Sequence, residues 1–314
     1  MHNKILMLTI IIIIIIIYSF YKMNYIYSSL MNNNEEYYYL LVPTAKILSG
    51  IYNTIVPEDN IVKNKKTKNK HYIPKIIWQT YKTKDLPYSA IDAHKSWVTK
   101  NVDWEVKIYD DNDIEKYIIE YWGSRTLTFY KNLTIGAMKA DLWRYLIMST
   151  HGGVYSDIDN LCTRSINSWI YENKLYDKKD ILLISLEPNE LYFCQWIFLS
   201  TPNHPAMRHV CEYILLNYEK NGINKSDPNF VFNTTGPAIW TKAIKNYLQL
   251  DDYSVKQIYA NYLNNKESFE NKYIYILPYY TFSIIYSITL IGSHMFKDNY
   301  QSWKVEQRKM NLIN

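Results

Sequence analysis

The chain has 314 residues, of which 48% are hydrophobic and 21% are charged, and it carries nine Trp and 32 Tyr. This composition supports a sizeable core in one large domain or two, which excludes an intrinsically disordered protein. The formal net charge of +5 is mild, and the sequence lacks the dense basic face of nucleic-acid-binding proteins. We therefore expect no nucleic-acid partner.

An almost unbroken apolar run, mostly isoleucine, occupies residues 5–21. Its length is at the lower edge of what a membrane-spanning helix needs, about 17 residues. A cleaved signal peptide is the alternative, but the residues that follow are bulky and contain no small-x-small cleavage site. The run therefore predicts an uncleaved transmembrane signal anchor after a short tail at residues 1–4. Lys4 and Lys22 flank it evenly, so charge alone sets no orientation.

Residues 22–70 are expected to form a stem or linker, which leaves residues 71–314 as the globular domain. The stem contains a basic run at 63–70 that has no apolar periodicity and is typical of a solvated linker. Two short helices are expected within the stem, at 37–42 and 47–56.

Strands and helices alternate along the globular part. Strands are expected at 73–80, 104–109, 154–157, 181–186 and 195–199, and helices at 88–99, 111–121, 137–148, 206–218 and 238–247. This alternation predicts an α/β fold with a mainly parallel sheet. Ligands in such sheets bind beyond the carboxyl ends of the strands.

The stretch from Gly136 to Asn160 carries the most specific pattern. It begins as a helix that places Asp141 and Arg144 on one face, because the two residues are three apart. A Gly-Gly turn follows, and then an apolar strand that runs into Asp157-Ile158-Asp159. Two carboxylates two apart on an extended chain point to the same side and repel each other unless a cation or a proton lies between them. Oxygen ligands of this kind select a hard divalent ion that bridges to substrate phosphates.

This stretch resembles the sugar-nucleotide-binding region of glycosyltransferase family 32, whose members carry a DXD motif. The family pattern is approximately A-x-K/R-S/A-D-x-x-R-Y followed by G-G-x-Y-x-D-x-D. The chain matches it with Ala137, Lys139, Ala140, Asp141, Arg144, Tyr145, Gly152, Gly153, Tyr155, Asp157 and Asp159. Looser similarity extends from about residue 73 to about residue 303.

The resemblance implies a GT-A-like fold, with a Rossmann-type sheet flanked by helices, and transfer of a hexose such as mannose. Asp157 and Asp159 would be catalytic by holding Mn²⁺ or Mg²⁺ on the diphosphate of a GDP- or UDP-sugar. Asp141, Arg144 and Tyr155 would bind the donor sugar, which passes to a glycan or glycolipid acceptor with retention of anomeric configuration. The family also implies type II topology, with the catalytic domain in the lumen of a Golgi- or ER-like compartment.

Further site residues follow from the same resemblance. Gln79 and Thr80 end a strand that lies near the nucleotide in the family, and Gly236 belongs to a Thr-Gly-Pro turn that is expected close to the site. His294, which precedes a Ser-Trp pair as in the family, would be a third metal ligand.

The turn Glu187-Pro188-Asn189-Glu190 is expected at the carboxyl end of the strand at 181–186. Either glutamate could reach a sugar, but a solvated loop is the favoured interpretation. The three cysteines show no metal-binding spacing, so zinc is not implied, and one disulfide could form among them.

Two other functional classes fit parts of the pattern. Another metal-dependent phosphate enzyme, a nucleotidyl- or phosphotransferase, would use the same aspartate pair but gives no reason for Asp141 or Arg144. A membrane-tethered sugar-binding protein with an inactive transferase fold is the other alternative, and the intact aspartate pair argues against it.

Overall fold

The computed structural model describes residues 34–58, 72–282, 287–289 and 307. The expected anchor at 5–21, together with His294 and the Ser-Trp pair, lies outside the described residues. Within the described ranges, no helix combines the length and the apolar character that a membrane crossing requires.

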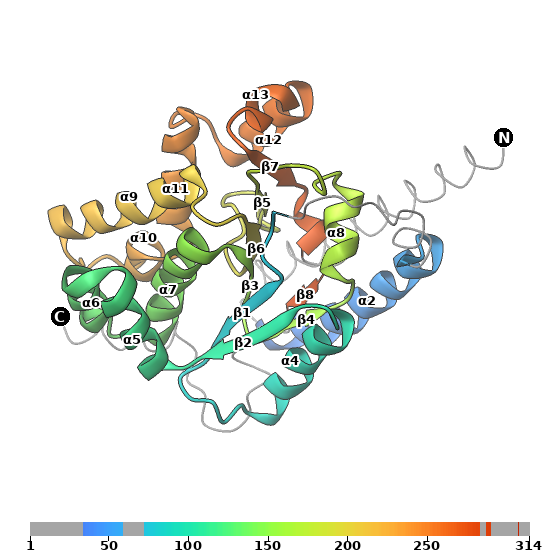
Figure 1. Cartoon of the computed structure of the whole chain (residues 1–314), viewed down its shortest axis with the longest axis horizontal. Coiled ribbons are helices and arrows are strands. Elements are labelled where there is room, and N and C mark those ends of the chain that lie inside the picture. Colours follow the sequence, from blue (N-terminus) through green and yellow to red (C-terminus); the bar gives the residue numbers. More distant parts are fainter. Residues whose placement is uncertain (1–33, 59–71, 283–286, 290–306, 308–314) are drawn as a thin grey trace.

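A six-stranded sheet forms the centre of the molecule, in the order β2-β1-β3-β6-β5-β7 (Figure 1). Only β6 runs antiparallel to its neighbours, so five strands point the same way. Their bounds are β1 Ile76–Thr80, β2 Glu105–Tyr109, β3 Gly153–Ser156, β5 Leu182–Ser185, β6 Ile197–Ser200 and β7 Ile274–Leu277. The mixed α/β architecture with a mainly parallel sheet is as the sequence predicts.

The central strands are buried on both faces, and their side chains alternate between two cores. On β3, Tyr155 joins the larger core and Val154 the smaller one, as the period of two in a strand requires. The larger core lies under α5 Asp111–Tyr121, α6 Gly123–Asn132, α7 Gly136–His151, α9 Pro205–Asn221, α10 Phe230–Thr234, α11 Pro237–Leu248, α12 Val255–Asn264 and α13 Lys266–Glu270. The smaller core lies under α4 Tyr88–Lys100 and α8 Ile166–Glu172, on the opposite face (Figure 1).

Helix ends follow the local sequence. Asp110 caps α5 by accepting a hydrogen bond from the backbone of Asp113, whose side chain accepts in return from Asp110, which is a capping box. Helix α7 ends because Gly152 and Gly153 adopt positive φ angles of 61° and 100°. The chain therefore turns at Gly152 and enters β3 at Gly153.

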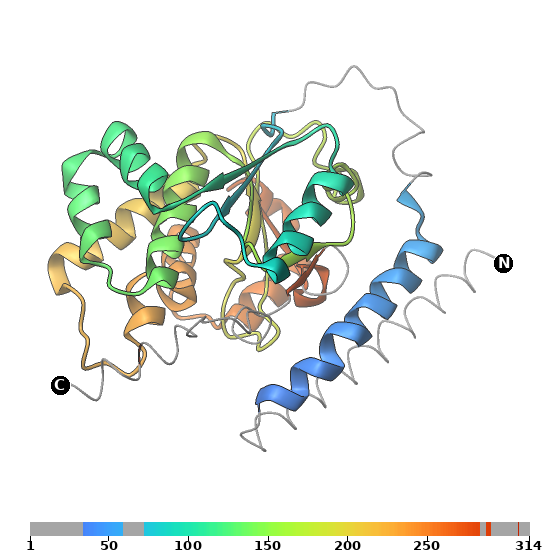
Figure 2. The same cartoon turned by 90° about the horizontal axis from the view of Figure 1, so that it is seen from below.

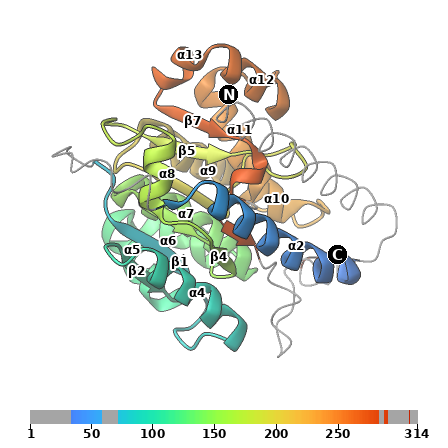
Figure 3. The same cartoon turned by 90° about the vertical axis from the view of Figure 1, so that its right-hand side faces the viewer.

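Helix α2 Asn34–Ile55 is one continuous helix, where the sequence suggested two shorter ones. It lies along the flank of the domain, near the two-stranded antiparallel sheet of β4 Asn160–Cys162 and β8 Ser287–Thr289 (Figures 2 and 3). The segment that ends α2 contacts Arg164, whose side chain is fully buried. Arg164 Nη1 donates to Asn53 Oδ1 at 2.7 Å and to the Val56 carbonyl at 2.8 Å, and its guanidinium lies over the Tyr52 ring.

All three cysteines, Cys162, Cys194 and Cys211, are free and buried, so the structure contains no disulfide between them.

Candidate active site

The carboxyl ends of the parallel strands meet at one edge of the sheet, and the sequence motifs gather there. Asp157 directly follows β3, and Glu187 lies two residues beyond the end of β5. Gln195 and Trp196 precede the antiparallel β6 at the same edge. The Asp157 N–H donates to the Trp196 carbonyl at 2.8 Å, which joins the end of β3 to the start of β6. The edge therefore places these segments together although they lie far apart in the sequence.

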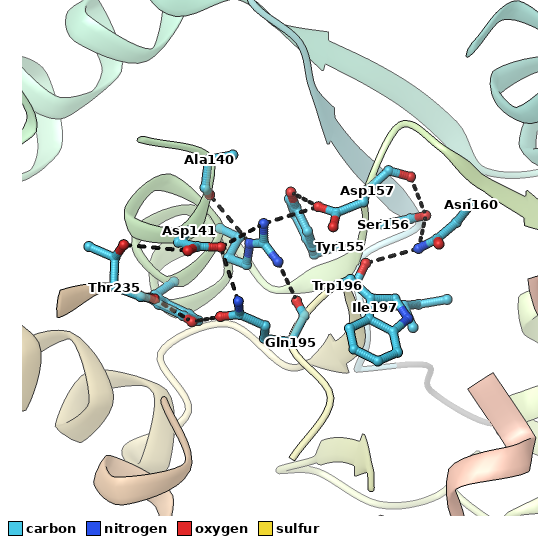
Figure 4. Close-up of polar contacts among 12 residues, drawn as sticks. Ala140, Asp141, Tyr155, Ser156, Asp157, Asn160, Gln195, Trp196, Ile197 and Thr235 are labelled. Atoms are coloured by element: carbon cyan, nitrogen blue, oxygen red, sulfur yellow. Dashed lines mark hydrogen bonds and ion pairs between the residues drawn. The ribbon is translucent and has the colours of Figure 1, made fainter. Parts of the chain in front are cut away.

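The DXD residues form a tight turn, which corrects the expectation of an extended strand. Strand β3 ends at Ser156, and the Asn160 N–H donates back to the Asp157 carbonyl at 3.1 Å. Asn160 Nδ2 also donates to the Trp196 carbonyl at 3.0 Å (Figure 4). Asp157 and Asp159 are therefore the first and third residues of a turn held on two sides, and both are partly exposed.

Arg144 is the buried cation of the site, with 5% of its side chain exposed. Its Nη2 lies 2.9 Å from Asp141 Oδ1 and 3.1 Å from Asp157 Oδ1. Its Nη1 donates to the Gln195 carbonyl at 3.0 Å, and the guanidinium lies 4.7 Å from the centre of the Tyr155 ring. The sequence predicted that Asp141 and Arg144 share one face of a helix. In the structure the Arg144 guanidinium also links this pair to the DXD turn.

Asp141 is held by neutral groups on its other sides. Gln195 Nε2 donates to Asp141 Oδ1 at 3.1 Å, and Thr235 Oγ1 donates to Oδ2 at 3.4 Å (Figure 4). The Tyr145 hydroxyl contacts Gln195 Oε1 and lies 2.9 Å from the Thr235 carbonyl. The network fixes the Asp141 carboxylate in one orientation, as a buried charge requires.

The electrostatics of the network follow from burial. Burial raises the pKa of Asp141 to about 7, against the opposing effect of Arg144. Burial alone would lower the pKa of Arg144, but Asp157, Tyr155 and Asp141 raise it well above its ordinary value, so Arg144 stays charged. The positive charge of Arg144 therefore compensates the carboxylates of both Asp141 and Asp157.

The DXD turn has the chemistry of a hard-cation site. Tyr155 donates a hydrogen bond to Asp157 Oδ1 at 2.6 Å, and Arg144 pairs with the same oxygen. In the described part of the chain, no hydrogen bond or ion pair engages Asp157 Oδ2, which belongs to a carboxylate that is 29% exposed. Asp159, two residues on, supplies further oxygens. The pair fits Mn²⁺ or Mg²⁺, both of which accept oxygen ligands.

The same ranges contain no group of three or more His, Cys, Asp or Glu side chains arranged to hold a metal. In proteins, Mg²⁺ is commonly held by one or two carboxylates and completes its shell with water and substrate phosphates.

Gln79 and Thr80 occupy the end of β1 but make other contacts. Gln79 is fully buried, with Oε1 lying 2.7 Å from His94 Nδ1, while its Nε2 has no hydrogen-bond partner among the described residues. Thr80 Oγ1 donates to the Tyr109 carbonyl at 2.8 Å. No hydrogen bond joins either residue to the network of Asp141, Arg144 and Asp157 in the described ranges.

Gly236 precedes α11 and packs against α10. A Cβ atom there would lie 2.8 Å from Phe232 Cα, so only glycine fits. Its neighbour Thr235 is the residue that contacts Asp141, which places the Thr-Gly-Pro turn beside the site.

Sequence reasoning missed Gln195 as a site residue and did not assign a role to the Thr235 side chain. Both reach Asp141 from segments distant in the chain, 54 and 94 residues away. The Thr-Gly-Pro turn was the only local signal, and it indicated proximity without indicating a contact.

Comparison with known proteins agrees with this geometry. Residues 87–176 match the model of the "glycosyltransferase sugar-binding region containing DXD motif". This range includes Asp141, Arg144 and the DXD turn. The match agrees with the family resemblance over the segment that carries the motif: residues 87–176 are similar to the sugar-binding region of DXD-containing glycosyltransferases.

The relatives of this chain include named mannosyltransferases. It is 30% identical to the initiation-specific alpha-1,6-mannosyltransferase of Schizosaccharomyces pombe over 67% of this chain and 57% of that protein. It is 27% identical to the Candida albicans protein of the same name, over 63% of this chain and 56% of that one. The chain thus spans little more than half the length of these relatives. A solved structure titled PaToxG Glycosyltransferase superposes with a TM-score of 0.46 at 15% identity, covering 88% of this chain and 95% of that one.

Proposed function

We propose that the chain is a metal-dependent glycosyltransferase that moves a hexose from a nucleotide-diphosphate sugar to a glycan or glycolipid acceptor. The observation that carries the proposal is the single guanidinium of Arg144, which joins Asp141 to the first aspartate of the DXD turn. A nucleotidyl- or phosphotransferase would need the aspartate pair but not this connection to a second buried carboxylate.

The chain's own residues divide the work. Asp141 and Arg144, oriented by Gln195 and Thr235, bind hydroxyl groups of the donor sugar. Tyr155 holds Asp157 by a hydrogen bond and covers the guanidinium with its ring. Asp157 and Asp159 hold Mn²⁺ or Mg²⁺, which when bound neutralises the charge that builds on the leaving diphosphate. In this proposal Gln79, Thr80 and Gly236, which lie at strand and helix ends, contribute to the binding of the nucleotide and the sugar.

The names of the relatives support a choice of donor sugar and acceptor for this proposal. Both first-named relatives are called alpha-1,6-mannosyltransferases, and another is an inositol phosphoceramide mannosyltransferase of Schizosaccharomyces pombe. We therefore favour mannose as the hexose, GDP or UDP as its carrier, and a glycan or glycolipid as the acceptor. The reaction proceeds with retention on a GT-A-like fold, so no dedicated base for the acceptor is required.

The proposal includes the membrane. The apolar run at 5–21 anchors the chain as a single-pass type II protein, with the catalytic domain in the lumen. His294 is a further ligand for the metal in this proposal.

The test is a donor screen with the full chain purified in detergent. Incubated with Mn²⁺ and a panel of GDP- and UDP-hexoses, the protein should release the nucleoside diphosphate from one donor, and chelation should stop the release. Asp157→Asn and Asp159→Asn should each lower the rate by about 100-fold or more, since each removes a charged metal ligand.

Circular dichroism and thermal unfolding of both variants separate loss of chemistry from loss of fold. Release of pyrophosphate, or transfer of phosphate, would replace the proposal with a phosphate-transfer enzyme. If no donor releases its nucleoside diphosphate and no nucleotide binds in a metal-dependent way, the chain is an inactive sugar-binding protein.

A further inference from the structure

Glu187 is a buried carboxyl group at the same edge of the sheet as the DXD turn. It follows the parallel strand β5 and is only 7% exposed, close to the 4% of both Asp141 and Arg144. Strand β5 is separated from β3 by β6 alone, and the Asp141 charge acts on the Glu187 carboxyl group, so the two carboxyl groups lie in the same region of this edge. The solvated loop that the sequence favoured for this residue is therefore wrong for Glu187.

The partners of the Glu187 side chain are few and uncharged. Its Oε2 accepts from Asn189 Nδ2 at 3.4 Å, a long hydrogen bond. Its backbone N–H donates to the Tyr192 carbonyl at 2.9 Å, which fixes the start of the turn. Within the described ranges, no Lys, Arg or His lies within ion-pair distance of it, whereas Glu190 in the same turn has Lys256 at 3.5 Å.

Arg144, the buried cation of the site, is already paired with other groups and forms no ion pair with Glu187. Arg144 pairs with Asp141 and Asp157 and donates to the Gln195 carbonyl. The titratable groups around Glu187 are Asp141 on α7, the Cys194 thiol and Glu190. Burial and, to a smaller extent, the Asp141 charge raise the pKa of Glu187 to about 8, against the opposing effect of the Asn189 hydrogen bond. A carboxyl group that is buried without a cationic partner favours its protonated form.

A protonated carboxyl group differs from an ionised one in what it can bind. It offers one O–H donor and one carbonyl acceptor, whereas an ionised carboxylate only accepts. A sugar hydroxyl both donates and accepts, so it matches a neutral carboxyl group on both counts. A metal ion or a base-catalysed step would require the ionised form, which this environment disfavours.

We propose that Glu187 acts as a neutral acid that hydrogen-bonds a hydroxyl group of the hexose beside Asp141 and so helps to determine sugar specificity. This inference rests on the function proposed above. The Asp141 oxygens accept from Arg144, Gln195 and Thr235, and Glu187 adds a group that can both donate to and accept from a sugar hydroxyl.

The decisive variant is Glu187→Gln, because an amide keeps one donor and one acceptor without any charge. For the donor screened above, we expect Glu187→Gln to raise KM by no more than about threefold, since the hydrogen bonds persist. Glu187→Ala should raise KM about tenfold or more, because a sugar hydroxyl then loses its buried partner. Glu190→Gln is the matched control from the same turn and should leave KM and kcat as in the wild type.

Specificity gives a readout that a purely structural role would not move. A deoxy donor that lacks the contacted hydroxyl should be discriminated against by the wild type and by Glu187→Gln, and accepted about equally with the parent sugar by Glu187→Ala. Equal discrimination by all three proteins, or an inactive Glu187→Gln beside an active Glu187→Asp, would overturn the inference. The second pattern would show that the ionised form is the working one.

Stability against pH tests the protonation state without any turnover. The folded-state pKa lies above the unfolded value of about 4.5, so ionisation is penalised only in the folded protein. The wild type should therefore lose urea stability relative to Glu187→Gln as pH rises from about 4.5 to about 8, and the two should differ least at the acid end. If the stability of the wild type and of Glu187→Gln changes with pH in the same way, Glu187 is not a neutral acid and the inference is wrong.

The two proposals fail in different ways. Donor turnover by the wild type combined with an inactive Glu187→Gln rejects the role of Glu187 and leaves the glycosyltransferase intact. A wild type that releases no nucleoside diphosphate rejects the sugar-binding role together with the proposed function, even if the pH comparison shows a neutral Glu187.

Discussion

Arg144 holds two carboxylates in place with one side chain, and the shape of the guanidinium makes this possible. Its planar fork contacts Asp141, Asp157 and the Gln195 carbonyl simultaneously. A lysine ammonium is a single point of charge and cannot reach all three with the same geometry. The directions in which its N–H groups point therefore matter in addition to its positive charge.

Removing this cation should be costly. Arg144→Met leaves Asp141 and Asp157 without their shared partner, and we expect it to lower the free energy of unfolding by about 3–5 kcal/mol. Arg125→Met is the matched control, because it breaks the pair with Glu219 in which the two side chains are 62% and 39% exposed. The control should cost about 1 kcal/mol or less. Urea unfolding of both variants measures the difference, and similar losses would contradict the central role of Arg144.

At this scale the sequence predicted local pairs and missed distant ones. Asp141 and Arg144 are three apart on a helix, so their contact is implicit in the helical period. Gln195 and Thr235 reach Asp141 only after the whole sheet has formed, and no spacing in the chain indicates it. Glu187 shows a further limit, since the same turn contains one buried glutamate and one that is paired at the surface.

Among the elements, α7 decides where the site residues lie, and glycines mark both of its ends. A Cβ at Gly152 would lie 2.5 Å from Pro202 N and 2.6 Å from the Ser200 carbonyl, at a φ of 61°. Gly136, at the first position of the helix, has open space around it. The end of α7 is therefore sterically constrained in a way that its start is not.

This asymmetry gives a paired prediction. Gly152→Ala should destabilise the protein by about 2 kcal/mol or more, because both the backbone conformation and the contact with the 200–202 segment resist a side chain. Gly136→Ala should be neutral or slightly stabilising, since alanine favours a helix. Thermal unfolding compares the two variants directly, and equal midpoints would refute the constraint.

Element boundaries were predictable where the sequence contains a cap or a strong apolar period. The helix at 111–121 was predicted with its observed bounds because acidic residues open it. The DXD turn was not, since a strand that runs into charged residues looks extended until the backbone bond from Asn160 to Asp157 is known. Strand β4 has three residues and a distant partner, so no local signal indicates it.

For the molecule as a whole, the buried Arg164 connects the residues at the end of α2 to the α/β domain. Beyond Asn53 and Val56, the Arg164 guanidinium pairs with Glu172, and Glu58 accepts a hydrogen bond from the Ser165 backbone at 2.9 Å. A buried charge that loses such partners is strongly destabilising. The expected domain start at residue 71 would remove the Asn53, Val56 and Tyr52 contacts and leave Glu172 as the ion-pair partner of this arginine among the described residues.

Truncation tests that boundary. A protein that starts at residue 34 should keep the unfolding midpoint of the full chain, whereas one that starts at residue 72 should melt several degrees lower, by roughly 4 °C for each kcal/mol lost. Arg164→Met in the full chain separates the two causes, because it removes the charge and leaves α2 present. Equal midpoints for the two truncated proteins would restore the boundary at 71.

The pairing of β4 with β8 has a consequence for biosynthesis. Strand β4 begins at Asn160, the last residue of the DXD turn, and its partner Thr289 belongs to a strand made much later in translation. Contacts of such long sequence separation form late, because the entropy of closing a large loop is lost before the contacts can stabilise the chain. A nascent chain can therefore assemble β1 to β3 and the aspartates early, but the motif reaches its final geometry only near the end of synthesis. Under the proposed function, metal and donor would therefore bind only once folding is nearly complete.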